Sequence, residues 1–593
     1  MYAQAYANND LAFIRWSYDQ KIPQCLGFCL ERIDKATGVA TILPAWVGFE
    51  NQKNEQWKAR DTSIWPVQKF NWRDFTATRG KTYSYNVIPM VGTPGNLKQI
   101  TDKSLHLHTN EVTLSPGSGN IKAYFNRGII STQSVSHAIE GPNHTPSSPK
   151  LMTSIQTPGN ELRERLMGQI KDALMEIIQE VKTKGGECYA ALYELNDPEL
   201  IDGLLSLGKK LHIILSNAGA NGDDDPNANE DKLPEDQRSS RRRLHDAGID
   251  ITDRILGNGH IGHNKFLVYV NSQGKAERVL SGSTNWTYTG MCAQTNNAIL
   301  ITSPELAKSY LDYWKALKAD DAEQGADFRT NNDEAHPVNI APTKIDLWFS
   351  PNTTKKTKPA SNPAAPGDMA EVFELMEKAQ KSIQFLAFQP GSPSILTKAL
   401  EIQQANPKLY IRGAATDAKA VSDYNTSLLA NESNKIDTVV AASNIKDQFA
   451  YWEQELLKSS NFAHAIIHDK IVVIDAYGDN PVVITGSHNL GYKASYANDE
   501  NLLIIKGNKE LANAYVVHVM DVYDHYRWRY ILQSSPSLAD AYHGLKTTDA
   551  WQDWYFKQAA KSSSQTESKP KSTPKPKAKP APKPKAKKAA KAE

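Results

Sequence analysis

The sequence predicts an α/β protein made of two similar halves, with an all-β sandwich domain before them and a disordered basic tail after them. Three observations support this architecture. Short strands of alternating polarity fill the first 115 or so of the 593 residues. Strands and amphipathic helices then alternate in two successive stretches, and the last segment is mostly Lys, Pro and Ala. The predicted units are residues 1–115, 116–342, 343–545 and 546–593.

The first unit is predicted from segments such as AFIRWSY, CLGFCLERI and KTYSYNVIPM, which turn residues separate. Trp16 lies on an early strand, and Tyr83 and Tyr85 lie on a late strand just after a Gly-Lys turn. This pattern resembles a fibronectin type III domain, with its core Trp and a strand of the form Y-x-Y-x-V. The resemblance implies a docking module, although a structural cap on the rest of the chain explains the same pattern.

The region after residue 115 repeats itself. The first half opens near residues 121–127 and the second near residues 345–351, each with a strand followed by an amphipathic helix. A buried strand, a second helix and a further strand come next in both halves. Strands that alternate with helices predict a largely parallel sheet covered on both faces. Two such halves packed together would place equivalent residues across a pseudo-twofold axis.

An acidic stretch rich in Pro and Asn, residues 221–236, interrupts the first half and is predicted to be a mobile loop. A basic helix start follows it, with Arg238, Arg241, Arg242 and Arg243. These arginines could lie near the mouth of a site or form an ordinary solvated helix face. The sequence leaves both interpretations open.

Each half carries His-x-Lys at the start of one strand and Gly-Ser-x-Asn at the end of the next, with a polar turn between the strands. His and Lys are two residues apart, so they project from the same strand face, and the hairpin brings Ser and Asn beside them. Eleven residues after the motif Asn, each half has a further polar residue. Two sets with the same order and offsets predict a functional site, where a lone motif would not. The two sets are His263, Lys265, Ser283, Asn285 and Asn296, and His468, Lys470, Ser487, Asn489 and Glu500.

These residue types suit a phosphodiester. Lysine and asparagine side chains donate to non-bridging oxygens and offset the negative charge that builds up in the transition state. Serine hydroxyls add donors or hold the turn. One histidine can attack phosphorus while the other, protonated, gives its proton to the leaving oxygen. Because the lysines take the place of a cation, we expect neither a metal nor a cofactor. The non-catalytic interpretation is that both histidines are core residues whose hydrogen bonds are satisfied within the fold.

The motifs resemble those of the phospholipase D superfamily, whose pattern is H-x-K-x4-D with G-S-x-N downstream. The second half matches fully, including Asp475, whereas Val270 stands at the corresponding position of the first half. The resemblance covers about residues 116–545. It implies two phospholipase D-like α/β halves with one site at their interface and a phosphohistidine intermediate.

The resemblance also implies that the downstream residue of each half orients the histidine of the same half. We therefore expect Glu500 to lie beside His468 and to favour its imidazolium form, which suits a general acid. His263, without that charge, is then the expected nucleophile.

The predicted activity is that of a phosphoric diester hydrolase, and the sequence leaves its substrate open between a phospholipid and a nucleic acid. The two-copy layout resembles that of phosphatidylcholine-cleaving enzymes, which would mean lipid degradation. The string GSTNWT resembles the compact nucleases of the superfamily, which would mean a metal-independent endonuclease. A non-catalytic polyanion-binding protein is a third hypothesis, which the complete set of His and Lys residues disfavours.

The C-terminal tail, residues 569–593, holds ten lysines and one glutamate, which leaves 58 basic and 65 acidic residues for the rest of the chain. Such a tail cannot form a core and could contact polyanions, either nucleic acid or an anionic membrane surface; a solubilising tail is the alternative. No apolar run is long enough to cross a bilayer, and the N-terminus has no secretory signal pattern. The default location is the cytoplasm, with signal-less export left open. Because both motifs lie in one chain, we expect a monomer.

Overall fold

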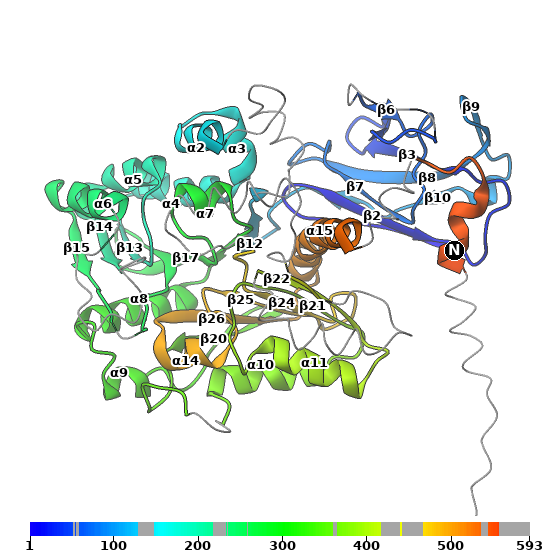
Figure 1. The fold of residues 1–593 in the computed structure, drawn as a ribbon. Helices are drawn as coiled ribbons and strands as arrows, with labels where there is room; N and C mark the ends of the chain where they lie inside the picture. The colour runs from blue at the N-terminus through cyan, green and yellow to red at the C-terminus, as the bar shows by residue number, and fades with distance from the viewer. Residues whose placement is uncertain are drawn as a thin grey trace, which may run out of the picture.

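A computed structural model gives the fold of the protein (Figure 1). Among the helices that it describes, none has both the length and the apolarity needed to span a membrane. It describes residues 1–50, 52, 54, 58–128, 148–216, 233, 235–257, 259–359, 364–416, 439–441, 467–534 and 544–556. The predicted acidic loop lies almost entirely outside the described residues, and the lysine-rich tail lies wholly outside them.

The N-terminal region is rich in β-strands, as predicted. One sheet has the order β1-β2-β7, and a second has the order β10-β8-β3-β4 with β9 and β11 also paired to β8. Trp16 and Tyr85 are buried in the core between these sheets, and the hydroxyl of Tyr83 accepts a hydrogen bond from the backbone N–H of Thr78 at 3.2 Å. The likeness to a fibronectin type III domain stays a prediction. The strands are β1 (Tyr2–Ala7), β2 (Ala12–Ser17), β3 (Gly27–Asp34), β4 (Ala40–Ile42), β5 (Pro44–Ala45), β6 (Arg60–Asp61), β7 (Asn71–Asp74), β8 (Thr82–Thr93), β9 (Asn96–Gln99), β10 (Leu107–His108) and β11 (Val112–Thr113).

Two α/β halves follow, which confirms the predicted fold class. The sheet of the first half has the order β12-β18-β17-β16-β13-β14-β15, and that of the second has the order β19-β20-β26-β25-β24-β21-β22-β23. The first sheet contains β12 (Ile121–Phe125), β13 (Glu187–Leu192), β14 (Leu211–Leu215), β15 (Asp250–Asp253), β16 (Lys265–Val270), β17 (Ala276–Gly282) and β18 (Asn297–Thr302). The second contains β19 (His336–Ile340), β20 (Thr343–Ser350), β21 (Ser382–Ala387), β22 (Tyr410–Ala415), β23 (Val439–Ala441), β24 (Ile471–Ile474), β25 (Val482–Gly486) and β26 (Glu500–Lys506).

The expectation of largely parallel sheets is wrong. Only β13–β14 and β14–β15 are parallel in the first sheet, and only β21–β22 and β22–β23 in the second. All other neighbouring strands of the two sheets are antiparallel. The motif strands are joined by short turns, which allow only antiparallel pairing, whereas parallel pairing needs the longer connections found elsewhere in each half.

Helices cover the outer faces of the two sheets and also lie between them. The inner faces of both sheets meet α8 and α15 in one shared apolar core, while α4 and α5 cover the outer face of the first sheet and α10 and α11 that of the second. The helices are α2 (Ser148–Gln156), α3 (Glu161–Met167), α4 (Ile170–Lys184), α5 (Pro198–Leu205), α6 (Glu235–Asp246), α7 (Tyr288–Cys292), α8 (Pro304–Ala319), α9 (Ala326–Thr330), α10 (Gly367–Glu377), α11 (Ile395–Ala405), α14 (Tyr492–Ala497) and α15 (Lys509–Ser534).

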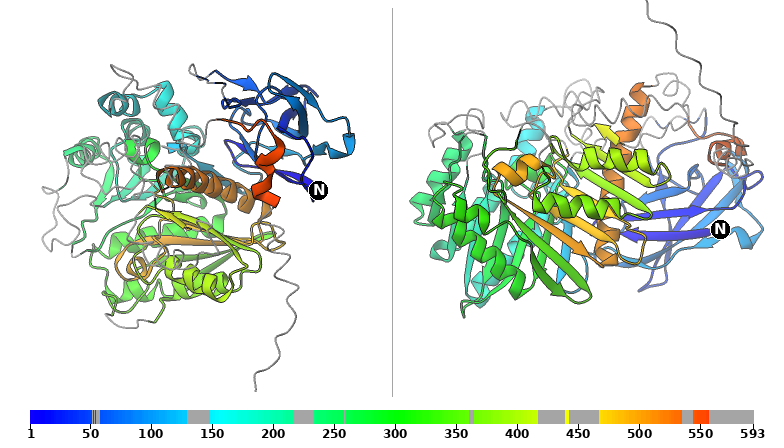
Figure 2. Two further views of the ribbon diagram at one scale, coloured as in Figure 1. Left: turned by 45° about the vertical axis from the view of Figure 1, so that its right-hand side comes forward. Right: turned by 90° about the horizontal axis from the view of Figure 1, so that it is seen from below.

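Helix α15 also joins the second half to the N-terminal unit. It lies between the sheet of the second half and the N-terminal sheets in Figures 1 and 2. Val517 on this helix packs with Tyr6 and Phe13 of the N-terminal unit. Arg73 on β7 of that unit lies 2.8 Å from the carboxylate of Asp521. The N-terminal unit is therefore fixed to the second half by apolar packing and a largely buried ion pair.

The chain returns to the N-terminal unit at residues 544–556, where the sequence predicted the beginning of a linker and tail at residue 546. The side chain of Gln552 exchanges two hydrogen bonds with the backbone of Ile22, at 2.9 and 3.0 Å. The indole of Trp551 donates to the carbonyl of Cys25 at 2.8 Å and packs edge-on against Phe28. The aromatic residues of this segment have an apolar face to bury, which the Lys/Pro/Ala composition of the tail does not supply.

We predict that Trp551→Ala lowers the free energy of unfolding by about 2 kcal/mol, because it removes a half-buried ring and its hydrogen bond. Urea unfolding followed by tryptophan fluorescence and circular dichroism measures the change. Trp554→Ala is the matched control, because Trp554 is 60% exposed and its loss should cost less than about 0.5 kcal/mol. Equal effects of the two substitutions would contradict the packing of this segment.

Candidate active site at the junction of the two halves

The two motif hairpins meet where the halves pack together. Strand β16 begins at Lys265 and pairs with β17, and β24 begins directly after Lys470 and pairs with β25. The rings of His263 and His468 lie next to each other in an edge-on arrangement, with centroids 6.2 Å apart and planes at 70°. Both histidines and both lysines are buried, and Asn285 is buried beside them. The structure thus brings motif residues of both halves to one place.

Each histidine lies beside a residue of the other half. The Nδ1 atom of His263 lies 3.0 Å from Oε1 of Glu500, an ion-pair contact without hydrogen-bond geometry, whereas Nδ1 of His468 is hydrogen-bonded to Oδ1 of Asn296 at 2.9 Å. The expectation that Glu500 lies beside His468 is therefore wrong. The cause is the way in which the two halves pair. Isolated β-bridges join Thr295 to Ile467, the residue before His468, and Ile261 to Asn498, the residue before Asp499.

Glu500 is fully buried, and each of its carboxylate oxygens accepts a hydrogen bond. Its Oε1 atom accepts a hydrogen bond from the side chain of Asn498 at 2.7 Å, and its Oε2 accepts one from the backbone N–H of Asn489 at 2.8 Å. Asn489 is thereby held at the turn after β25. Burial raises the pKa of Glu500, which nearby cations and the hydrogen bond from Asn498 oppose.

The two lysines occupy equivalent positions. Lys265 Nζ donates to the carbonyl of His263 at 2.7 Å, and Lys470 Nζ donates to the carbonyl of His468 at 2.6 Å. Each ammonium also lies over an aromatic ring, at 4.9 Å from the centre of Tyr193 in the first half and 5.0 Å from that of Phe388 in the second. The same two rings pack against His263 and His468.

The electrostatics of the site favour an anionic ligand. Burial lowers the pKa of Lys470 to about 7 and holds the pKa of Lys265 well below its usual value, with the second lysine adding repulsion. Burial and the same lysines hold the pKa values of His263 and His468 well below 6.5. A bound phosphodiester would stabilise the charged forms of all four groups. Within the described part of the chain, no three His, Cys, Asp or Glu side chains converge as a metal site.

The two motif serines hold the strands that follow them. Ser283 donates to Asn296 Oδ1 at 2.9 Å, and so fixes the amide that contacts His468. Ser487 accepts a hydrogen bond from the backbone N–H of Asn501 at 3.0 Å. Both hydroxyls are buried in these contacts, so the structure gives them the role of holding the turn.

Asp475 lies away from the histidines. It follows the last residue of β24, whereas the motif precedes the first, and it has a left-handed backbone with φ of 50°. Its carboxylate accepts hydrogen bonds from the backbone N–H groups of Gln380, Lys381 and Ser382 at 2.6 to 2.9 Å. This aspartate therefore caps the start of β21. Val270 at the corresponding first-half position is a buried core residue.

One acidic residue in the site was missed by sequence analysis. Glu194 is only 6% exposed and accepts a hydrogen bond from Nδ2 of Asn285 at 2.6 Å. Burial raises the pKa of Glu194 to about 7, against the attraction of Lys265 and Lys470. Its only sequence signal is its place two residues after the buried strand β13, where side chains beyond the strand end can reach a site.

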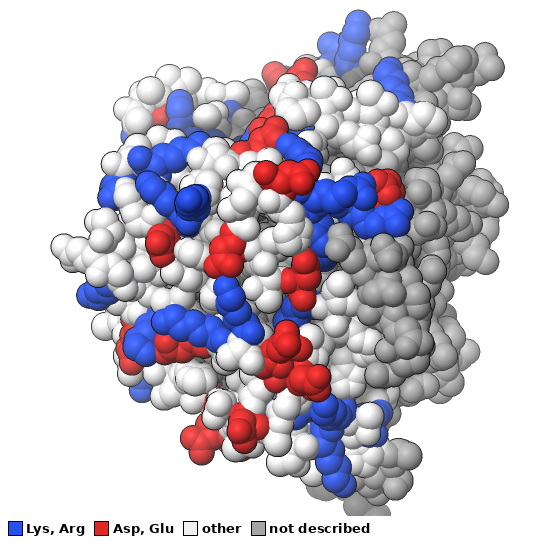
Figure 3. Space-filling view, turned by 90° about the vertical axis from the view of Figure 1, so that its left-hand side faces the viewer, with Lys and Arg blue, Asp and Glu red and all other residues white. Residues whose placement is uncertain are grey.

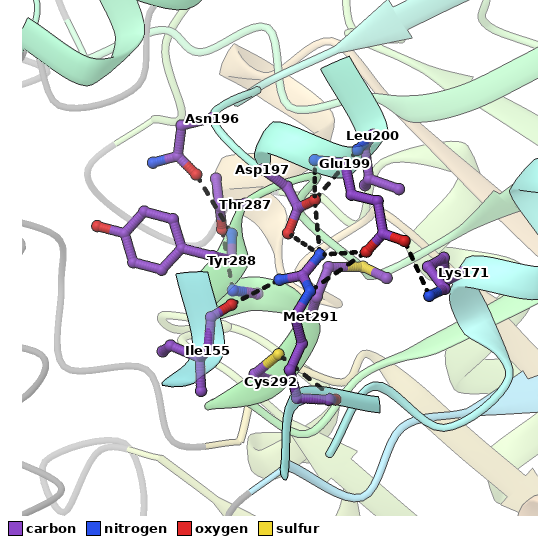
Figure 4. A network of polar contacts seen from close by, with 12 residues as sticks. Ile155, Lys171, Asn196, Asp197, Glu199, Leu200, Thr287, Tyr288, Met291 and Cys292 are labelled. Atoms are coloured by element: carbon purple, nitrogen blue, oxygen red, sulfur yellow. Dashed lines mark hydrogen bonds and ion pairs between the residues drawn. The ribbon is translucent and has the colours of Figure 1, made fainter. Parts of the chain in front are cut away.

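A buried ion-pair network braces the loop that carries Glu194 (Figure 4). The guanidinium of Arg163, which is fully buried, lies 2.8 Å from Asp197 and 3.1 Å from Glu199. The side-chain oxygen of Asn196 accepts a hydrogen bond from the backbone N–H of Tyr288 at 3.3 Å. The network therefore ties the loop after β13 to the segment that follows Asn285.

The arginines of α6 are paired with carboxylates. Arg241 is buried and contacts Asp253, Arg238 and Arg242 contact Glu235, and Arg243 contacts Asp202. Among the described residues on the face shown in Figure 3, basic and acidic side chains intermingle and form no continuous basic surface. The paired contacts favour the reading of these arginines as structural and solvated residues of the helix.

Comparisons with known proteins agree with the two-half architecture. The family model "Cardiolipin synthase, PLD-like domain" matches residues 177–318 and 372–519, one stretch in each half. Each half thus contains a phospholipase D-like domain, and the chain has the fold of the phospholipase D superfamily phosphodiesterases. A comparison with curated proteins found no match.

Solved structures similar to the chain include three from bacteria. A polyphosphate kinase from Porphyromonas gingivalis is 11% identical with a TM-score of 0.35, over 62% of this chain and 50% of that one. The chain thus spans half the length of that kinase. A phosphatidylserine synthase from Haemophilus influenzae Rd KW20 is 13% identical with a TM-score of 0.38, over 62% of this chain and 91% of that one. Nuc, a phospholipase D family member from Salmonella typhimurium, is 19% identical with a TM-score of 0.19, over 24% of this chain and 82% of that one.

We predict that inorganic tungstate binds this site about tenfold more tightly at pH 6 than at pH 8. The sign follows from the lowered pKa of Lys470, about 7, because the ammonium form that attracts an anion is lost as the pH rises through that value. Isothermal titration calorimetry across this range measures the change. Lys470→Met should weaken binding and flatten its pH dependence. Equal affinity of the unaltered protein at both pH values would contradict the prediction.

Proposed function

We propose that the chain is a phosphodiesterase that cleaves its substrate through a covalent phosphohistidine on His263. The observation that carries the proposal is the adjacent pair of histidines, 6.2 Å between ring centroids, with a lysine from each half beside them. This spacing suits a phosphorus atom between two ring nitrogens, one of which attacks while the other serves the leaving oxygen. The lysines and Asn285 supply donors for the non-bridging oxygens.

In the first step, Nε2 of His263 forms a bond to phosphorus and the bond from phosphorus to the leaving oxygen breaks. His468, protonated when the anionic substrate is bound, gives the leaving oxygen its proton. In the second step, His468 takes a proton from water, the water oxygen bonds to phosphorus, and the N–P bond of His263 breaks. The second step regenerates both histidines in their starting forms.

The contact between His263 and Glu500 supports this division of roles, although for a different reason from the one that the sequence suggested. A carboxylate beside Nδ1 favours the tautomer with its proton on Nδ1, which leaves the lone pair of Nε2 free for phosphorus, and it offsets the positive charge that forms on the ring. His468 has the neutral amide of Asn296 at the same position. Its imidazolium is therefore less stabilised and gives up its proton more readily.

The family model that matches both halves favours a phospholipid as the substrate, because it describes cardiolipin synthase-type domains. Endonuclease activity is the second candidate, favoured by the ten lysines of the C-terminal tail. The acceptor of the second step is proposed to be water, and an alcohol acceptor would make the reaction a transfer.

We predict that His468→Asn accumulates an adduct on His263 when it is given bis(p-nitrophenyl) phosphate in EDTA. The p-nitrophenolate leaves without a general acid, so the first step proceeds, but the second step lacks its base. Mass spectrometry of the intact protein and of its peptides detects and locates the adduct. His263→Asn should form none. An adduct on His468 in His263→Asn would make His468 the nucleophile and His263 the general acid. The absence of any adduct in either variant would contradict the covalent mechanism.

We also predict that the unaltered protein, in EDTA, releases headgroups from vesicles of phosphatidylcholine and phosphatidylglycerol, and that each histidine substitution lowers the rate at least 10³-fold. Single- and double-stranded DNA and RNA form a parallel assay, and glycerol is added as an alcohol acceptor. Cleavage of nucleic acid alone would make the protein a nuclease. Glycerol adducts as the main product would make it a transferase, and activity that survives both substitutions would contradict the site.

A further inference from the structure

The pseudo-symmetry of the site breaks at one pair of residues. Tyr193 and Phe388 are equivalent, because each follows its buried strand and contacts the His and Lys of its own half. The next residue is Glu194 in the first half and Gln389 in the second. Glu194 is buried in the site, whereas Gln389 is exposed.

A carboxylate is unexpected in a site that receives an anion, since an ionised Glu194 would repel the phosphodiester. The charged and titratable groups around it are Lys265 from β16, Lys470 before β24, Asp236 from α6 and Tyr288 from α7. Burial and Asp236 disfavour the ionised form, whereas the two lysines and the hydrogen bond from Asn285 favour it, and the resulting pKa is about 7. Lysines that turn to a bound phosphate would remove part of that attraction.

The hydrogen bonds of Asn285 indicate what a neutral carboxyl would do. One Nδ2–H of Asn285 is donated to Oε2 of Glu194, which leaves the other Nδ2–H for a substrate oxygen. Among the described residues, Oδ1 of Asn285 is buried without a hydrogen-bond partner. A protonated carboxyl has an O–H to donate as well as an oxygen that accepts, so it can pair with both ends of this amide.

We propose that Glu194 is a positioning residue that takes up a proton when the phosphodiester binds, and that its neutral carboxyl then holds the amide of Asn285 toward the non-bridging oxygens. The inference rests on the proposed function for its substrate class. The proton comes from solvent on binding and returns to it on product release, so no net proton is consumed at this group.

Substitution by glutamine isolates this role. Glu194→Gln has the same shape and the same pair of one donor and one acceptor for Asn285, but it cannot ionise. Gln389→Glu is the matched control, because it places a carboxylate at the equivalent position of the second half, where the side chain is exposed. Glu194→Ala removes the partner of Asn285 altogether.

Proton uptake on anion binding is the first test, and it needs no turnover. Titration with inorganic tungstate at pH 7 in buffers of different ionisation enthalpy gives the number of protons taken up. We expect Glu194→Gln to take up fewer than the unaltered protein, by about half a proton, and Gln389→Glu to match the unaltered protein. Equal uptake by the unaltered protein and Glu194→Gln would overturn the proposal.

The pH dependence of turnover is the second test. With bis(p-nitrophenyl) phosphate, the ratio of kcat/KM of Glu194→Gln to that of the unaltered protein should rise about tenfold from pH 6 to pH 8.5, because only the unaltered protein loses its neutral carboxyl. Glu194→Ala should raise KM more than it lowers kcat. A ratio that is constant with pH, or that falls as the pH rises, would contradict the role. If no covalent adduct forms in the mass-spectrometry experiment, but Glu194→Gln still takes up fewer protons than the unaltered protein on binding tungstate, the proposed covalent chemistry is wrong and the role of Glu194 in anion binding stands.

Discussion

The fold depends on an exchange of buried polar groups between the two halves. Besides the contacts of the histidines, the side chain of Asn297 donates to Thr485 at 2.8 Å, and that of Asn501 donates to Asn264 at 3.0 Å. These groups are out of reach of water, and an unpaired buried polar group costs about 1–3 kcal/mol. The side-chain amide of Asn297 donates to Thr485 and to Tyr515, both of the second half. The requirement fixes how the sheets meet, and with it the distance between the histidines.

A near-symmetric scaffold carries an asymmetric set of charges. Glu500 comes from the second half and Glu194 from the first, yet both contact residues of the first-half motif. At the equivalent places around His468, the described residues offer the amide of Asn296 and the exposed Gln389. The same backbone arrangement therefore gives its two histidines different partners. Differences of this kind allow the histidine of one motif to act as the nucleophile while the histidine of the other motif transfers protons.

The sequence predicted the two α/β halves and the hairpins that carry the motifs, because periodicity and residue spacing are local properties. It did not predict the partner of His263, because the contact with Glu500 is made between halves and local offsets do not report which half a side chain faces. The prediction of parallel strands was wrong for a similar reason, because the alternation of helices and strands does not determine which strands are neighbours. Glu194 was missed because a single acidic residue after a strand has no spacing partner that could reveal it.

The return of residues 544–556 to the N-terminal sheets bears on the order in which the protein folds on the ribosome. The first strands emerge early, but Gln552 and Trp551, which fill one edge of their core, are synthesised some 500 residues later. At typical rates of about 5–20 residues per second, this delay is on the order of half a minute to two minutes. The N-terminal unit is thus completed long after its own strands are made, and during that interval its open edge is available to chaperones or to other nascent chains.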